Sequence, residues 1–139
     1  MPNAVQTYLK YGLLLFVFVA NGQVFAGTGQ PRLLSDLDIP LMAGFQEDRD
    51  SRVIFDTPQG RIIEGRASGP HKAAKVFDYY RLVLPTLSWQ TTAGKIKNCG
   101  GAAFLCLRAQ RDGEILTIKI RQVRQSGQKT VIYFSVNPE

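Results

Sequence analysis

The feature that most constrains this chain is the stretch of residues 68–89, which carries the one helical pattern among predicted strands. Its apolar side chains recur with the period of an α-helix, at Ala73, Val76, Tyr80, Val83 and Leu84. Ser68 is a suitable N-cap, Pro70 fits the first turn because its missing N–H costs nothing there, and Pro85 is expected to end the helix. Trp89 then fills the end of the core. The stretch predicts one amphipathic helix that covers a sheet.

A β-hairpin is predicted before this helix. Residues 52–67 contain two β-branched runs on either side of a Thr-Pro-Gln-Gly turn. Val53 and Phe55 share one face of the first strand. In the second strand Ile63, Gly65 and Ala67 lie on the face opposite to Ile62, Glu64 and Arg66.

Further strands are predicted after the helix, a weak one at residues 90–97 and a stronger one at 102–109, followed by a tight turn at 111–113. In residues 114–123 buried and solvated positions alternate, Leu116, Ile118 and Ile120 with Thr117, Lys119 and Arg121. Residues 130–136 follow, with Ile132, Phe134 and Val136 inward. A hairpin, one helix and a meander of three or four strands predict a single α+β domain at residues 51–139, an antiparallel sheet with one covering helix.

The N-terminus has the composition of a signal peptide. Lys10 precedes an apolar run without any acid before it, and Val24 and Ala26 are small residues at the positions that a signal peptidase reads. We expect cleavage after Ala26, so that residues 1–26 are removed, and an exported protein, periplasmic in a bacterial source. The alternative is an uncleaved anchor that leaves the protein membrane-associated.

Residues 27–50 are rich in turn formers and have no sustained period, so they predict an extended N-terminal segment. A cluster within it that includes Leu41, Met42 and Phe45 is too apolar for a free tail. It packs either on its own domain, which we favour because exposed apolar patches are uncommon on monomers, or against a partner.

Several short motifs resemble a family of small exported proteins of α-proteobacterial type, which has no assigned activity. They are DIPLMAGF at residues 38–45, VIFD at 53–56, GRI at 60–62, YY at 79–80, LP at 84–85, Trp89, and RDGE at 111–114. The part from helix to sheet also resembles the β-α-β-β-β modules of envelope lipoproteins, including those attached to the outer-membrane assembly machinery. The chain departs from the pattern at Ser88, where a Gly is usual, and at residues 99–107, which are longer. The resemblance implies the fold and hardly any function.

Few residues carry a recognisable chemistry. Cys99 and Cys106 are the only cysteines, and an even pair in an oxidising compartment favours a structural disulfide. A two-residue hairpin loop would hold them too far apart and a wider loop would let them bond, so both outcomes stay open. His71 lacks the further ligands that a metal site needs, and no catalytic motif is present. The sequence therefore indicates neither an enzyme nor a cofactor or metal.

The main candidate site is basic. The formal net charge is +6 at pH 7. We expect a positive stripe, called the basic stripe below. It is made of Lys119 and Arg121 on the outer sheet face, Arg124 and Lys129 in the loop that follows, and Arg108 on the neighbouring strand. Such a stripe either binds an anionic ligand, lipid or polymer, or only keeps the sheet face soluble and prevents pairing of the sheet edge with another strand. Nucleic acid is not an expected partner in an exported compartment.

Two hypotheses follow. The first is a non-catalytic periplasmic interaction module, an accessory or assembly subunit of an envelope protein complex, which docks through a sheet edge or through Leu41, Met42 and Phe45. The alternative is a binder of an anionic ligand or membrane surface through the basic stripe. The oligomeric state stays open, because a small sheet has free edges.

Overall fold

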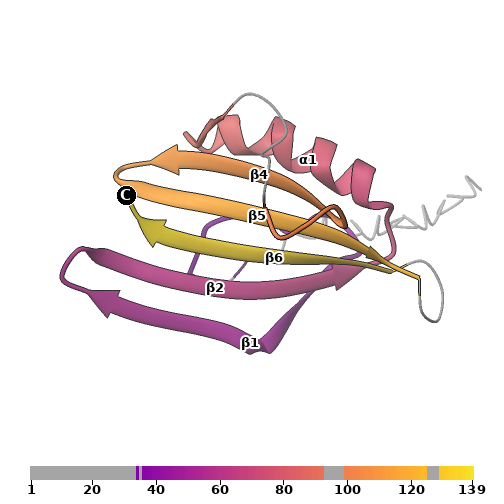
Figure 1. The fold of residues 1–139 in the computed structure, drawn as a ribbon, viewed down its shortest axis with the longest axis horizontal. Coiled ribbons are helices and arrows are strands. Elements are labelled where there is room, and N and C mark those ends of the chain that lie inside the picture. The colour runs from indigo at the N-terminus through magenta and orange to yellow at the C-terminus, as the bar shows by residue number, and fades with distance from the viewer. Residues whose placement is uncertain (1–33, 35, 93–98, 125–128) are drawn as a thin grey trace, which may run out of the picture.

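The computed structural model describes residues 34, 36–92, 99–124 and 129–139, and the predicted signal peptide lies outside them. In this part of the chain the elements are β1 (Gln46–Thr57), β2 (Gly60–Gly69), α1 (Ala73–Thr86), β3 (Gln90–Thr91), β4 (Phe104–Arg111), β5 (Glu114–Val123) and β6 (Lys129–Pro138). The sheet order is β1-β2-β6-β5-β4-β3, with all neighbours antiparallel. The predicted α+β class, an antiparallel sheet with one helix on it, is confirmed (Figure 1).

The chain's last strand joins its two halves. β6 pairs with β2 on one side and with β5 on the other, so the N-terminal hairpin and the C-terminal strands form one sheet. The tight turn between β4 and β5 is present as predicted, with positive φ at Asp112 (51°) and Gly113 (78°), the geometry of a type I′ hairpin. β3 covers the first two residues of the strand predicted at residues 90–97, and residues 93–97 lie outside the described part of the chain.

One face of the sheet is the core face. The alternation predicted for β5 and β6 is confirmed, because the inward residues are all at most 1% exposed: Leu116, Ile118, Ile120, Ile132, Phe134 and Val136. α1 packs over β3, β4 and β5, and its buried residues are Val76, Tyr80 and Leu84. Among the described residues no helix covers the opposite face of the sheet, which we call the open face.

The helix begins later than predicted. Ser68 is not its N-cap, because β2 continues to Gly69 and the backbone of Ser68 pairs with Val131 of β6. The N-cap is Lys72, whose side chain makes no capping hydrogen bond. Instead the N–H of Ala73 donates to Gln122 Oε1 at 2.9 Å. A side chain from β5 thus satisfies a helix N–H that local capping leaves free.

The helix also ends differently. Pro85 does not stop it, because Pro85 lies within the last turn and the helix reaches Thr86. The end is a Schellman motif, in which Trp89 N–H donates to Leu84 O at 3.1 Å and Ser88 N–H to Pro85 O at 3.2 Å. Ser88 occupies the left-handed position of this motif with φ 65°. Trp89 is 1% exposed and fills the end of the core as predicted.

The segment of residues 34 and 36–45 also packs on the core face. Leu41, Met42 and Phe45 are 6%, 8% and 3% exposed and form part of the chain's own core. The favoured prediction, packing on the chain's own domain, is confirmed, and the partner-docking prediction is corrected because these side chains offer no exposed surface. Their burial has a simple cause: α1 packs mainly over β3, β4 and β5 and leaves apolar surface of β2 and β6 to be covered. Phe45 lies against Gly69, where a Cβ would come 2.5 Å from the ring. Residues 46–50, expected to be extended, begin β1.

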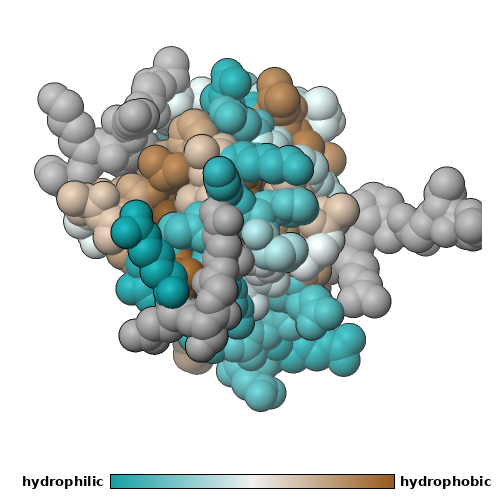
Figure 2. All heavy atoms as spheres, turned by 90° about the vertical axis from the view of Figure 1, so that its right-hand side faces the viewer, coloured by the Kyte–Doolittle hydropathy of each residue, from teal (hydrophilic) through white to brown (hydrophobic). Residues whose placement is uncertain are grey.

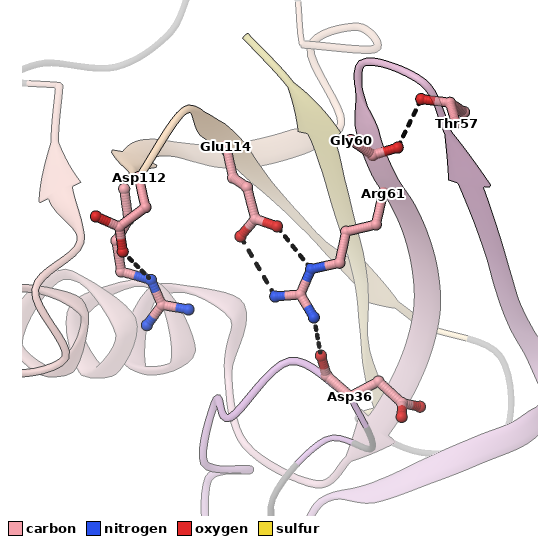
Figure 3. A network of polar contacts seen from close by, with 7 residues as sticks. Asp36, Thr57, Gly60, Arg61, Asp112 and Glu114 are labelled. Atoms are coloured by element: carbon pink, nitrogen blue, oxygen red, sulfur yellow. Dashed lines mark hydrogen bonds and ion pairs between the residues drawn. The ribbon is translucent and has the colours of Figure 1, made fainter.

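A charged contact fastens this segment to the sheet. Arg61 Nε donates to Glu114 Oε1 at 2.6 Å and so joins β2 to β5 across the end of β6, as Figure 3 shows. The same guanidinium donates from Nη1 to the carbonyl oxygen of Asp36 at 3.3 Å. Hydrogen bonding to Glu114 raises the pKa of Arg61 above its usual value. The fork-shaped guanidinium thus links three chain segments.

Candidate ligand-binding groove

A groove of about 560 Å³ lies on the open face of the sheet. It extends from Ser51 in β1 to Phe104 in β4, and we call it the open-face groove. Between these ends it is lined by Arg66 of β2, by Tyr133 and Ser135 of β6, and by Thr117 and Lys119 of β5. It is thus assembled from strands that lie far apart in the sequence.

The strand register brings three of these side chains into one row. Arg66 is the register partner of Tyr133, and Tyr133 is the partner of Lys119. Directly opposite residues of antiparallel strands point to the same face, with Cβ atoms about 5 Å apart. Two cationic side chains therefore stand on either side of one phenol ring, separated by two strand spacings, or about 10 Å.

Aromatic rings form the wall of the groove near β4. The rings of Phe104 and Tyr133 are 6.2 Å apart and inclined by 67°, an edge-to-face arrangement. The guanidinium of Arg121 lies 5.6 Å from the centre of the Phe104 ring, within cation–π range. A ligand in the groove would meet aromatic surface and positive charge side by side.

The two cations in the row differ in their electrostatic surroundings. Arg66 forms an ion pair with Asp48, and this contact lowers the pKa of Asp48 and raises that of Arg66. Lys119 is half-buried and, among the described residues, makes no ion pair. Glu64 also lines the groove and contributes a negative charge near β1. The positive potential of the groove is therefore concentrated at its β4–β5 side.

A disulfide lies at that same side. Cys99 and Cys106 are bonded, with Cα atoms 6.2 Å apart, which settles the alternatives that the sequence left open. The loop is wider than a two-residue turn, because β4 starts only at Phe104. The bonded loop brings Gly100 beside two residues that line the groove, because a Cβ there would lie 3.5 Å from the Phe104 ring and 4.0 Å from Lys119 Cδ. The disulfide thus lies next to the groove without lining it.

The basic stripe is only partly one site. Lys119 lines the groove and so lies on the open face. Arg108 and Arg121 lie on the same face, because directly opposite residues share a face and their register partners, Thr117 and Phe104, also line the groove. Lys129 opens β6 and Arg124 follows β5, so both lie at the end of the sheet that Figure 2 views, where hydrophilic side chains gather. Arg108, Arg121, Arg124 and Lys129 do not line the groove, so Lys119 is the one residue of the basic stripe in its lining.

The sequence prediction missed Arg66, Tyr133 and Phe104. Alternation in β2 had placed Arg66 on the face opposite to Ala67, and the same alternation in β6 puts Tyr133 opposite to Phe134. Those patterns show a face, but only the pairing of β2 with β6 brings Arg66 beside Tyr133.

Two further observations concern the described residues alone. No group of three or more His, Cys, Asp or Glu side chains is placed there to hold a metal ion. Within the same part of the chain, the helix is too short and too polar to cross a membrane.

Comparison of the chain with protein-family models, with curated proteins and with solved structures finds no match. The resemblance to exported envelope proteins therefore stays a prediction.

Proposed function

We propose that this protein is a non-catalytic, exported binding module that holds an anionic ligand in the open-face groove. The observation that carries the proposal is Lys119, which is half-buried and has no counter-ion among the described residues. A partly desolvated ammonium without a partner attracts an anion more strongly than a fully solvated one. Arg121 and Arg108 add to this field from the same face.

The polar and aromatic groups indicate the kind of ligand. The hydroxyl groups of Thr117, Tyr133 and Ser135 can donate hydrogen bonds to phosphate or carboxylate oxygens. The Phe104 and Tyr133 rings provide surface for a flat or apolar part of the same molecule. These features together favour a phosphate or carboxylate anion, and the rings would strengthen binding where the same molecule carries a flat or apolar part.

The shape of the site favours a ligand that enters the groove over a membrane surface. Lys119 lies within a groove whose walls extend to Ser51 and Phe104. A planar layer of lipid head groups would reach the exposed Arg108 and Arg121 more easily than Lys119. If a membrane were the target, the exposed cations would matter more than the half-buried one.

Export is part of the proposal because two features support it. The apolar run before Ala26 has signal-peptide character. The disulfide between Cys99 and Cys106 fits an oxidising compartment, since such bonds persist mainly outside the cytosol.

The test is an NMR titration of the isotope-labelled protein with tripolyphosphate and with citrate. These probes carry several phosphate or carboxylate groups and so can reach more than one cation of the row. We expect amide shifts at Lys119, Tyr133 and Phe104 that shrink as salt is added, because salt screens partly exposed charges. Shifts confined to α1, or none at all, would overturn the proposal. Vesicles of phosphatidylglycerol test the membrane alternative, which predicts broadening of the whole spectrum.

A further inference from the structure

The long edge of the sheet exposes apolar side chains. β1 is the outermost strand, and one of its edges is unpaired within the described residues. Val53, Ile54 and Phe55 are 37%, 44% and 61% exposed. Unpaired backbone groups together with exposed apolar side chains are the features by which an edge strand recruits another strand. The open-face groove does not account for them, because none of the three lines it.

The edge is regular only in its second half. The register of β1 against β2 shifts between Asp48 and Val53, and from Val53 to Thr57 the pairing is continuous. The apolar residues therefore lie on the regularly paired stretch, with Arg52 directly before it and Asp56 within it, both exposed. When two copies of this stretch run antiparallel, the positive end of each lies opposite the negative end of the other and the apolar residues lie opposite one another.

We propose that β1 pairs antiparallel with β1 of a second copy of this chain, around a two-fold axis at Ile54. In this register Ile54 faces Ile54 of the second copy, Val53 faces Phe55, and Arg52 faces Asp56. Each contact except the first occurs twice, as an isologous interface requires. The dimer therefore contains an apolar centre between two cross-strand ion pairs, and opposite charges directly across strands stabilise such pairing.

Neighbouring registers are less favourable. A two-fold axis perpendicular to the sheet leaves the helices of the two copies on the same side of the joined sheet. Alternative registers that keep this arrangement differ by a shift of two residues of one strand against the other, because a shift of one residue would exchange the two faces. Centred on Val53, the pairing would place Asp50 opposite Asp56, which is repulsive. Centred on Phe55, it would place Ile54 opposite Asp56. The register at Ile54 alone among these matches charge with opposite charge and apolar with apolar residues.

The ion pair has one competitor within the chain. Arg52 Nη1 lies 3.3 Å from Asp36 Oδ2, and both side chains are exposed. Such an exposed pair adds little to stability, so Arg52 can exchange Asp36 for Asp56 of a second copy at small cost. Asp56 makes no ion pair among the described residues and is thus available.

The test is a charge-swap experiment read by light scattering on a sizing column over a series of concentrations. We expect the unaltered protein to shift from monomer to dimer mass as its concentration rises. Arg52→Asp alone and Asp56→Arg alone should each be monomeric at concentrations where the unaltered protein is dimeric. Mixed in equal amounts, the two variants should form a heterodimer, because every Arg then meets an Asp.

The controls separate this interface from loss of fold and from other surfaces. Phe55→Lys should also be monomeric, with an unchanged circular dichroism spectrum, whereas Leu82→Lys on the exposed side of α1 should still dimerise. An unaltered protein that stays monomeric throughout overturns the proposal and leaves the edge for a strand of another protein. Single variants that dimerise as well as the unaltered protein, or a mixture that shows no heterodimer, overturn it as well.

Discussion

Lys119 of β5 and Tyr133 of β6 are directly opposite each other, and both point to the open face of the sheet. Because Arg66 stands on the other side of the same tyrosine, one phenol ring separates two cations of different character. One is neutralised by Asp48 and the other is not. The affinity of the groove for an anion should therefore depend on which of these charges is removed.

Removing the carboxylate of Asp48 should strengthen anion binding. In Asp48→Asn the guanidinium of Arg66 loses its ion pair and becomes available to a ligand. We expect tripolyphosphate affinity to rise by a few-fold, because solvent screens an exposed ion pair and its loss frees the guanidinium at little cost. Asp78→Asn removes the same charge from the exposed side of α1 and should change the affinity little. Isothermal titration calorimetry compares the two, and equal effects would argue against a local site.

Reduction of the disulfide should weaken both the fold and the groove. The bond between Cys99 and Cys106 closes a short loop, for which chain entropy gives about 2–3 kcal/mol. Because the bond also holds Gly100 against Phe104 and Lys119, tripolyphosphate affinity should fall in the Cys99→Ser/Cys106→Ser protein. Urea unfolding and calorimetry measure the two effects. An affinity that survives loss of the bond would show that the loop does not shape the groove.

Packing between the N-terminal segment and β2 should be sensitive to a single methyl group. Gly69→Ala places a Cβ 2.5 Å from the Phe45 ring, and overpacking of this kind costs about 1–3 kcal/mol. Phe45→Leu frees space, so the double variant should be more stable than the sum of the single changes predicts. A double-mutant cycle by urea unfolding gives the coupling, and purely additive effects would place Phe45 elsewhere.

The helix end should tolerate, and prefer, a glycine. Ser88 has φ 65°, a conformation that costs a residue with a Cβ more than it costs glycine. Ser88→Gly should therefore raise the free energy of unfolding by up to about 1 kcal/mol. Ser88→Val, which places a β-branched residue in the same position, should lower it. Thermal unfolding of both variants tests whether Ser88 holds the left-handed conformation at the helix end, and a destabilising Ser88→Gly would contradict it.

Local patterns account well for one strand at a time. The alternation of Leu116, Ile118 and Ile120 with polar residues is enough to place Lys119 and Arg121 on the face opposite to the core. The same applies to the turn before Glu114, whose Asp-Gly sequence has a strong conformational preference. Predictions of this kind held because each depends only on neighbours along the chain.

Predictions failed where a distant segment decided the outcome. Ser68 is a good N-cap by its chemistry, yet pairing with Val131 in β6 draws its backbone into the sheet. The helix is capped instead by Gln122, far along the chain. Likewise, Arg66 and Tyr133 share the groove only because β2 pairs with β6, which no local period reveals. For Leu41, Met42 and Phe45 the favoured prediction of self-packing is confirmed, whereas the docking alternative fails because one helix covers little of β2 and β6 and these residues cover the rest.

The most direct test of the groove is the tripolyphosphate affinity of Lys119→Gln beside that of Lys75→Gln, measured by calorimetry at low and high salt. Both variants lose one positive charge, but Lys75 is exposed on α1, away from the groove. We expect Lys119→Gln to bind at least about tenfold more weakly, because a hydrogen bond to a charged group contributes about 1.5–3 kcal/mol, while Lys75→Gln binds as the unaltered protein does. Equal losses in the two variants would mean that net charge alone attracts the anion, and would contradict a binding site at Lys119.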